Sequence, residues 1–336
     1  IVSLSSGVLG EPFAAHELKI GEERLRALGL SVKYMPHAKM GMAYLRAHPE
    51  ARAADLLAAF RDPEVDMILC AIGGDDTYKL APYLFENDAL QKAVTDKIFL
   101  GFSDTTINHF MLHKVGLPTF YGQAFLPDVC EIGADMLPYT RRYFEELIRT
   151  GHIAAVTPSD IWYETRKDFS ADQVGTAMPA YKNDGFELLR GHARFEGEIL
   201  GGCMDTIFDM FDGTRYADMP DVIRRYGLFP AAGAWRGKIL LLESSEEKPS
   251  PEKYRRALEY LRDAGVFAVV SGVLVGKPMD DTHHAAYKQA LLDVIPDMEL
   301  PIVCNLSVGH AQPRCILPFG VHATVDADTQ RITFAF

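Results

Sequence analysis

Short apolar runs alternate with helical patterns along the first third of the chain, and this alternation restricts the possible folds more than any other feature. Helical periodicity occurs in four segments, residues 12–28, 49–60, 80–90 and 105–115. Apolar runs typical of strands flank them, at residues 1–5, 31–34, 65–72 and 98–102. Because strands and helices follow one another in this order, we predict an α/β fold in which helices cover both faces of a parallel sheet. Ligand sites of such sheets lie at the carboxyl ends of the strands.

The rest of the chain predicts a second unit, joined to the first by a long irregular segment. Residues 158–187 mix Asp, Lys, Pro and Gly with aromatic residues, as long functional loops do. Strand patterns return at 197–200, 238–243, 266–275 and 301–305, with a helix at 251–264 and an alternating hairpin at 315–336. We therefore divide the chain into residues 1–140, a linker with an aromatic loop at 141–187, and a smaller β-rich α/β domain at 188–336.

Charge and hydropathy argue against two classes of partner. The 46 acidic residues outnumber the 34 basic ones, and no run of Lys and Arg offsets the formal charge of −12. Such a surface repels phosphate backbones, so we expect no nucleic-acid partner. No apolar run approaches the ~20 residues of a membrane span, so we expect no membrane partner. Five scattered cysteines without CxxC spacing, and an amino terminus without a signal-like stretch, indicate a cytoplasmic protein with reduced thiols.

A strand runs directly into a helix at the segment LGFSDTT, residues 100–106, with Ser103 at the corner. The N–H of Asp104 then lies at a helix amino terminus, where amide groups are free and the helix dipole favours negative charge. A hydroxyl beside such a donor suits a nucleophile next to an oxyanion site. The alternative is that Ser103 or Asp104 only caps the helix. The glycine pattern is not the GxSxG elbow, because Thr105 occupies its last position.

A serine nucleophile needs a base, and the base needs an acid to orient it. Glu243 ends the apolar run LLLE at 240–243, and His310 follows a strand and a glycine in the segment LSVGH at 306–310. The order Ser, Glu, His is compatible with a triad built across two domains. Taken singly, Glu243 could equally be a solvated charge at a strand end, and His310 a loop histidine with a structural hydrogen bond.

Other segments offer competing chemistry. The segment GGDDT at 73–77 is similar to the GGDGT loop that cradles nucleotide phosphate in phosphofructokinases and NAD kinases, but Asp76 stands where that motif has Gly. A zinc site at His109 and His113 is not expected, because the HExxH pattern is absent. The aromatic residues Trp162, Tyr163 and Phe169 of the linker either pack on the core or form a lid that stacks on a flat ligand group.

Several segments together resemble the LD-carboxypeptidase family of serine peptidases, and within it the branch of microcin C self-immunity (MccF-like) proteins. The likeness covers nearly the whole chain, and its specificity lies in the order and spacing of the motifs. The matching segments are SLSSG at 3–7, DPEVD at 62–66, IGG at 72–74, GFSDTT at 101–106, TFYG at 119–122, GGCMDT at 201–206, LE at 242–243, GH at 309–310 and LPFG at 317–320.

The resemblance implies a reaction and a role for each matching residue. Ser103 would attack the scissile carbonyl, His310 would take its proton and return it to the leaving group, and Glu243 would hold the imidazole. The family fold is a flavodoxin-like amino-terminal domain and a β-rich carboxyl-terminal domain, with the site in the cleft between them. The family uses no metal and no cofactor, and its members are commonly homodimers, which we expect here as well.

The resemblance also implies an oxyanion site and two substrate classes. The backbone N–H groups of Asp104 and of Gly74, or its neighbour Gly73, would bind the oxyanion. One branch removes a terminal D-Ala from murein peptides, and the other cleaves the amide between a peptidyl residue and a nucleotide-like group. An aromatic side chain stacks on the nucleobase in the second branch, and Trp162 or Phe186 would be the candidates here.

Two departures from the family pattern concern the substrate. Cys203 replaces the usual Asn of the GGN loop, and Asp75 and Asp76 follow the glycine pair where small or amide residues are more usual. Two carboxylates close to the pocket would disfavour an anionic substrate end, and we include Asp75 among the substrate-binding residues. We predict a serine hydrolase of amide bonds acting on a small peptide or peptidyl-nucleotide. The alternatives are a phosphate-loop kinase and a non-catalytic peptide-nucleotide binding protein.

Overall fold

The computed structural model describes residues 1–336, and its first half is built around a four-stranded sheet in the order β1-β2-β3-β12. Strands β1 (Met67–Leu69), β2 (Ile98–Gly101) and β3 (Thr119–Tyr121) are parallel. The fourth strand, β12 (Leu317–Phe319), comes from near the carboxyl end of the chain and pairs antiparallel with β3. A strand from the second half therefore completes the sheet of the first.

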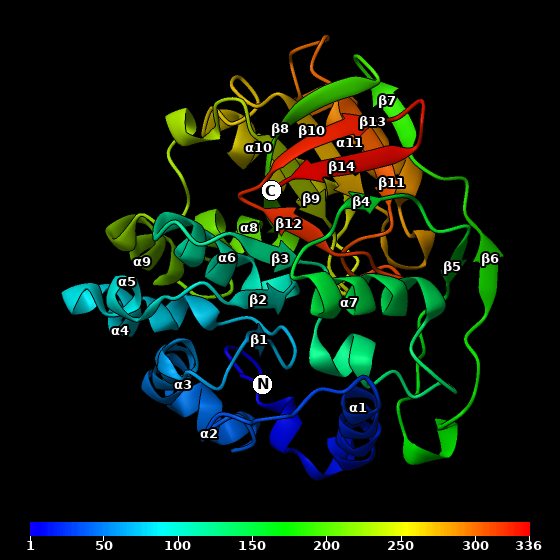
Figure 1. The fold of residues 1–336 in the computed structure, drawn as a ribbon. Coiled ribbons are helices and arrows are strands. Elements are labelled where there is room, and N and C mark those ends of the chain that lie inside the picture. Colours follow the sequence, from blue (N-terminus) through cyan, green and yellow to red (C-terminus); the bar gives the residue numbers. More distant parts are fainter.

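Seven helices belong to the first half of the chain. Figure 1 shows that α1 to α3 lie on one side of the sheet, below β1 in this view, and that α7 lies to the right of the sheet. Their bounds are α1 (Ala15–Ala27), α2 (Met42–Ala47), α3 (Pro49–Arg61), α4 (Ala81–Phe85), α5 (Ala89–Ala93), α6 (Thr106–Lys114) and α7 (Pro138–Thr150).

The second half is built on an eight-stranded sheet, β4-β14-β13-β8-β9-β10-β11-β7, in which β8 to β11 are parallel. Its strands are β4 (Ala155–Val156), β7 (Glu187–Arg190), β8 (Arg194–Cys203), β9 (Ile239–Glu243), β10 (Gly272–Gly276), β11 (Ile302–Leu306), β13 (His322–Asp326) and β14 (Arg331–Ala335). Its helices are α8 (Met204–Asp212), α9 (Met219–Tyr226), α10 (Pro251–Asp263) and α11 (His284–Val294).

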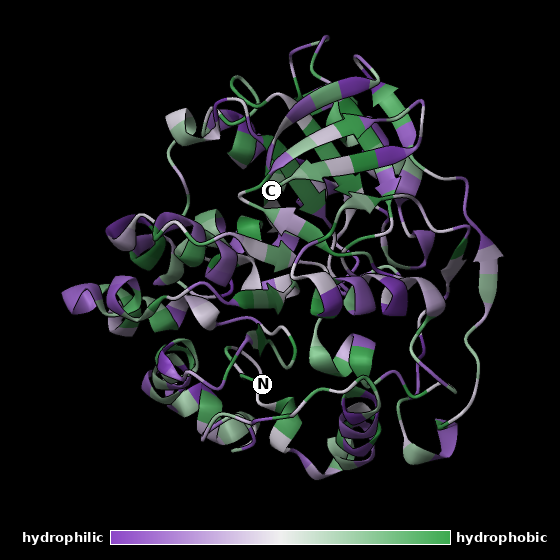
Figure 2. Ribbon diagram, in the orientation of Figure 1, coloured by the Kyte–Doolittle hydropathy of each residue, from purple (hydrophilic) through white to green (hydrophobic).

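The sequence explains these central elements. Strand β9 lies between β8 and β10 and all its residues are buried, which is why it reads as the continuous apolar run Ile239–Leu242. Helix α10 starts where Pro251 takes the first helical position and the Ser250 side chain accepts from the N–H of Lys253. In Figure 2 the strands in the interior of this sheet are mostly hydrophobic, while helix faces that point outward carry polar residues.

Residues 158–187, expected as an irregular loop, contain a two-stranded hairpin. Strands β5 (Ile161–Tyr163) and β6 (Ala180–Lys182) pair antiparallel, at the right edge of the molecule in Figure 1. The segment between them, which we call the lid segment (residues 164–179), runs down to the first half of the chain. There the N–H of Gly175 donates to the carbonyl of Ile132, and the His16 ring bonds the carbonyl of Phe169.

Two predicted strands at the start of the chain do not form as strands. Residues 1–5 lie along β1, but only Val2 forms a bridge, to Cys70. Residues 31–34 form no strand and reach the sheet through the bond from the N–H of Met35 to the carbonyl of Ile1. The buried apolar side chains of both halves form one continuous cluster. None of the helices is long and apolar enough to cross a membrane.

Candidate active site

Ser103 stands at the corner between β2 and the short helical turn η5 (Ser103–Thr105). Its φ of 67° is in the left-handed region, which a non-glycine residue seldom adopts. Phe102 before it is extended, so the chain turns sharply at the serine. Such strained corners cluster at functional sites, where they hold a side chain in one direction. The side chain of Ser103 is thereby fixed at the carboxyl end of β2.

The structure brings the three predicted residues into one hydrogen-bonded line. Ser103 Oγ lies 3.0 Å from His310 Nε2, and His310 Nδ1 lies 2.7 Å from Glu243 Oε2. Glu243 is the last residue of β9, and His310 follows β11 in a loop, so the line joins both halves of the chain. All three residues are buried, with exposed fractions of 8%, 1% and 7% for Ser103, Glu243 and His310.

The buried carboxylate of Glu243 has partners on both oxygens. Oε1 accepts from the hydroxyl of Tyr121 at 2.6 Å, and Oε2 accepts from the backbone N–H of His310 at 3.2 Å as well as facing the ring. A buried carboxylate needs such donors to remain charged. These bonds fix the Glu243 carboxylate, and the carboxylate in turn fixes the orientation of the His310 ring. Tyr121 was not singled out in the sequence.

The charges around His310 favour its protonated form. Burial alone would lower the pKa of the imidazole, but the carboxylates of Glu243 and Glu246 outweigh burial and raise the pKa to about 10. Glu246 lies in the loop after β9, and its Oε2 is 3.0 Å from His310 Nε2. The sequence analysis did not name Glu246 among the site residues.

The two glycines of the segment 73–77 pack directly against the serine corner. A Cβ on Gly73 would fall 2.6 Å from Ser103 Cβ and 3.3 Å from the backbone N of Asp104. Gly74 has a φ of 151°, and a Cβ there would meet Ser5 Oγ at 2.2 Å. Only glycine fits at either position.

The acidic residues near the glycine pair have different surroundings. Asp104 turns its buried carboxylate away from the serine, to the Ser5 hydroxyl at 2.6 Å and the N–H of Thr77 at 2.9 Å, and burial raises its pKa to about 6. Asp76 forms a buried ion pair with Arg52 at 2.6 Å, so its charge is balanced inside the protein. Of the aspartates at 75 and 76, only Asp75 lines a pocket beside Ser103.

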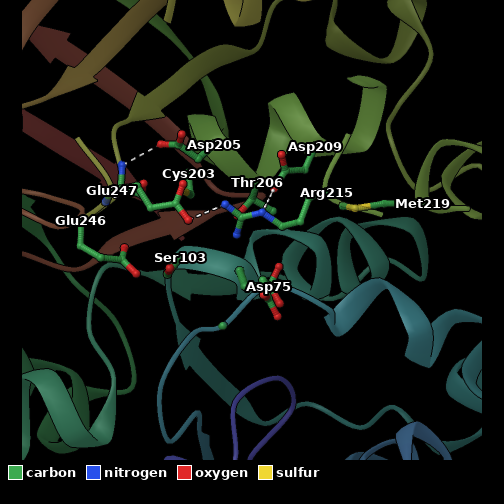
Figure 3. A pocket seen from close by; sticks show the side chains of 13 residues that line it. Asp75, Ser103, Cys203, Asp205, Thr206, Asp209, Arg215, Met219, Glu246 and Glu247 are labelled. Atoms are coloured by element: carbon green, nitrogen blue, oxygen red, sulfur yellow. Dashed lines mark hydrogen bonds and ion pairs between the residues drawn. The ribbon is translucent and has the colours of Figure 1, made fainter. Parts of the chain in front are cut away.

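Two cavities meet at Ser103. The smaller, of about 30 Å³, is lined mainly by polar residues, and Figure 3 shows Arg215 at its centre between Asp209 and Glu247, with Asp75 on the opposite wall. The larger has a volume of about 750 Å³. Apolar rings line part of it, Phe13 and Phe169 among them, and both side chains are roughly half exposed. Ser103 and Glu246 line both cavities.

The two aromatic candidates for ligand stacking do not line either cavity. Trp162 stacks on Tyr181, its partner across the β5–β6 hairpin, with ring centroids 4.6 Å apart, and Lys277 Nζ lies over the same ring. Phe186 is 6% exposed and belongs to the apolar core. The hairpin register places Trp162 opposite Tyr181, so the two rings lie side by side on one face of the hairpin. Phe169 of the lid segment and Phe13 line the large cavity, as does the buried Phe102 beside the serine.

Cys203, Glu243 and His310 have side-chain donor atoms within 4.8 Å of one another. Both carboxylate oxygens of Glu243 and both ring nitrogens of His310 already have hydrogen-bond partners in the protein. Burial holds the pKa of the Cys203 thiol well above its usual range, so the sulfur stays protonated. The hydrogen bonds of Glu243 and His310 and the protonated thiol fit a proton-transfer line, and we assign no metal to this cluster.

Comparison with known proteins agrees with this geometry. The model of the LD-carboxypeptidase N-terminal domain matches residues 1–122, and that of the LD-carboxypeptidase C-terminal domain matches residues 196–325. A Treponema pallidum protein, named as a carboxypeptidase, is 31% identical over 93% of this chain and 85% of its own length. The microcin C7 self-immunity protein MccF of Escherichia coli is 26% identical over 84% of this chain and 77% of its own.

A solved structure is more similar still. The MccF-like protein from Streptococcus pneumoniae, in complex with AMP, is 58% identical, has a TM-score of 0.99, and matches 100% of this chain and 97% of its own. These matches confirm the expected α/β fold and the expected family. They exclude the two alternatives, a phosphate-loop kinase and a non-catalytic binding protein. The chain belongs to the LD-carboxypeptidase family and is a carboxypeptidase-type enzyme that hydrolyses peptide bonds.

Proposed function

We propose that the protein cleaves an amide bond with Ser103 as nucleophile, His310 as base and acid, and Glu243 as the group that orients the imidazole. The observation that carries the proposal is the buried line of 3.0 Å and 2.7 Å from hydroxyl to imidazole to carboxylate. In the reactive state Ser103 Oγ attacks the carbonyl carbon while Nε2 takes its proton. Nε2 then gives that proton to the leaving nitrogen as the C–N bond breaks, which leaves the acyl group on Ser103 Oγ. A water molecule, deprotonated by Nε2, attacks this ester, and the acid leaves as the proton returns to Ser103 Oγ.

The oxyanion site of this proposal consists of two backbone N–H groups. Asp104 lies in the first turn of η5, where N–H groups have no intrahelical partner. The carbonyl of Gly73 accepts from the N–H of Ser6, so the N–H of Gly74 in the same planar peptide unit points the opposite way. Each pre-aimed donor of this kind contributes about 3 kcal/mol to catalysis.

For the substrate we propose a peptidyl-aminoacyl-nucleotide, whose nucleotide part would occupy the large cavity. A volume of about 750 Å³ suits a ligand of that size. Phe13 and Phe169 offer faces on which a base can stack, and the MccF-like relative at 58% identity was solved with AMP. An LD-configured murein peptide is the second candidate, which the family resemblance favours. A homodimer and the division into two domains with a linker remain proposals.

Ser103→Ala tests the assignment. We expect hydrolysis of a peptidyl-aminoacyl sulfamoyl adenosine to fall by at least ~10³-fold, because the substitution removes the hydroxyl that bonds His310 Nε2. Ser271→Ala is the matched control. Ser271 directly precedes β10, its hydroxyl donates to backbone carbonyls, and it lies outside both cavities. A murein tetrapeptide assayed alongside separates the two substrate classes. Full hydrolysis by Ser103→Ala would contradict the proposed mechanism.

A further inference from the structure

Glu246 carries a carboxylate that contacts the imidazole on its reactive side. His310 uses Nδ1 for Glu243, which leaves Nε2 as the atom that faces the substrate. Two oxygens lie at the same distance of 3.0 Å from Nε2, Ser103 Oγ and Glu246 Oε2. Figure 3 shows the Glu246 side chain directed toward Ser103, whereas its neighbour Glu247 is directed toward Arg215.

The contact between Glu246 and His310 fits only one protonation state of the ring. A carboxylate oxygen accepts hydrogen bonds and donates none, so it faces Nε2 favourably only when Nε2 carries a proton. The Glu243 carboxylate at 2.7 Å makes the same demand of Nδ1, so the two contacts together fit only the charged ring with both nitrogens protonated. A general base must instead present an unprotonated Nε2 to the serine hydroxyl. The Glu246 contact and the reactive state therefore exclude each other.

We propose that Glu246 is a positioning residue that holds His310 in a protonated resting state and is displaced when the substrate occupies the site. This inference rests on the proposed function of Ser103 and His310. In the resting state Nε2–H donates to Glu246. When the carboxylate leaves, the Nε2 proton passes to solvent, and Nε2 can then accept the proton of the Ser103 hydroxyl.

The loop that carries Glu246 is fixed, while the side chain itself is free to turn. The N–H of Ser245 donates to Asp205 at 3.0 Å, the N–H of Lys248 donates to the carbonyl of Ser245 at 3.1 Å, and Lys248 pairs with Asp280. The Glu246 side chain is nevertheless 62% exposed. Rotation about side-chain bonds alone can thus move the carboxylate into solvent.

The place of the carboxylate explains why a substrate would displace it. Glu246 lines both cavities that meet at Ser103. A substrate whose carbonyl carbon sits at the hydroxyl extends into the space that Glu246 borders. Its leaving nitrogen must approach Nε2 to be protonated, and Glu246 Oε2 now occupies that side of the ring.

The other charged or titratable groups near His310 do not face Nε2. Glu243 bonds Nδ1 and is bonded by Tyr121, and the Cys203 thiol lies beside Glu243. Arg314 donates to the carbonyl of His310 and is paired with Asp128 at 2.9 Å. Arg215 is paired with Asp209 and Glu247. The Glu246 carboxylate is exposed but loses some of its water to neighbouring groups; interaction with His310 outweighs this desolvation and lowers its pKa to about 2, so the carboxylate stays charged at working pH.

Glu246→Gln tests the inference through the pH dependence of kcat/KM. Activity requires neutral His310, so kcat/KM rises as pH passes the pKa of the ring. Removing a charge at 3.0 Å should move this rise to lower pH by about one unit or more. Glu247→Gln is the matched control, because that carboxylate pairs with Arg215 and Lys253 instead, and its rise should stay within about 0.3 unit of the wild-type value. An NMR titration of the His310 ring without substrate should show the same shift.

Several outcomes would overturn the inference. They are an unmoved pH profile in Glu246→Gln, an equal shift in Glu247→Gln, or a raised KM with no change in the pH profile, which would mark Glu246 as a substrate contact. The proposed function fails differently, if the wild-type profile shows no rise with pH or if Ser103→Ala keeps full activity. The two failures are therefore distinguishable.

Discussion

Ser103, with its left-handed backbone conformation, packs directly against Gly73. This contact predicts what happens when a methyl group is added at Gly73. In Gly73→Ala the new Cβ would lie 2.6 Å from Ser103 Cβ, a distance that forces one of the two backbones to shift. The N–H of Asp104 is 3.3 Å from the same point, so the proposed oxyanion donor would move with it. We expect kcat/KM to fall by about 100-fold or more, the cost of one misplaced donor.

The control for this substitution is Gly233→Ala. No atom lies within 4 Å of a Cβ at Gly233, so the same added methyl meets open space there. Far-UV circular dichroism should show folded protein for both variants, and only Gly73→Ala should lose activity in a kinetic assay. Wild-type activity in Gly73→Ala would mean that the glycine pair does not set the geometry of the serine corner.

At the residue scale, the sequence was informative wherever a reactive side chain ended a strand. Ser103 and Glu243 directly follow or close apolar runs, and His310 follows a strand and a glycine, so their common edge could be expected. Glu246 gives no such signal, because consecutive glutamates after a strand are typical of a solvated turn. The charge balance of Asp76 depends on Arg52, which lies in helix α3 and is brought to the aspartate only by the tertiary fold.

The β5–β6 hairpin and its lid segment determine which aromatic residue can reach a ligand. Trp162 pairs with Tyr181 across the hairpin, while Phe169 lines the large cavity from the lid segment. We predict that Phe169→Ala raises KM for a nucleotide-bearing substrate by about 5- to 150-fold, the equivalent of 1–3 kcal/mol for one stacked base. Cleavage of a short peptide without a nucleotide should change little.

Trp162→Ala is the comparison for Phe169→Ala. It removes a larger ring from strand β5, next to the lid segment, but leaves the cavity lining unchanged, so its KM for the nucleotide-bearing substrate should stay within about threefold of the wild-type value. Steady-state kinetics on both substrates measure the difference. A larger effect from Trp162 than from Phe169 would restore the expectation drawn from the sequence and would require the hairpin to rearrange on binding.

At the element scale, periodicity predicted the long buried elements better than the short ones. Helix α10 and strand β9 agree with the expected ranges to within one residue at each end, because Pro251 and a continuous apolar run mark them. The expected strand at 31–34 does not form: this stretch bonds the chain start, where the amino group of Ile1 donates to the carbonyl of Lys33 and the N–H of Met35 to the carbonyl of Ile1, without a regular strand ladder. Hydropathy alone cannot distinguish such an edge segment from a paired strand.

At the scale of the whole molecule, the two halves are joined by more than the linker. Strand β12 comes from the carboxyl-terminal part of the chain, yet its backbone completes the amino-terminal sheet beside β3. The sequence showed an alternating pattern there, but it did not show which sheet the strand would join, because a three-residue strand carries no partner signal. The line from Ser103 to His310 and Glu243 crosses the same junction.

This junction predicts that the molecule unfolds in one step, although chains with two independent domains usually unfold in separate steps. In a Trp162→Phe background, fluorescence reports only Trp235, which is fully buried in the second half, while far-UV circular dichroism also follows the helices of the first half. We expect both signals to give the same urea midpoint.

Phe319→Ala should lower both midpoints together. Phe319 of β12 is buried and stacks on Tyr121 of β3 with ring centroids 5.1 Å apart, and such a truncation costs about 3–5 kcal/mol of stability. Two separate midpoints in either variant would mean that the halves are stable independently and that β12 does not couple them.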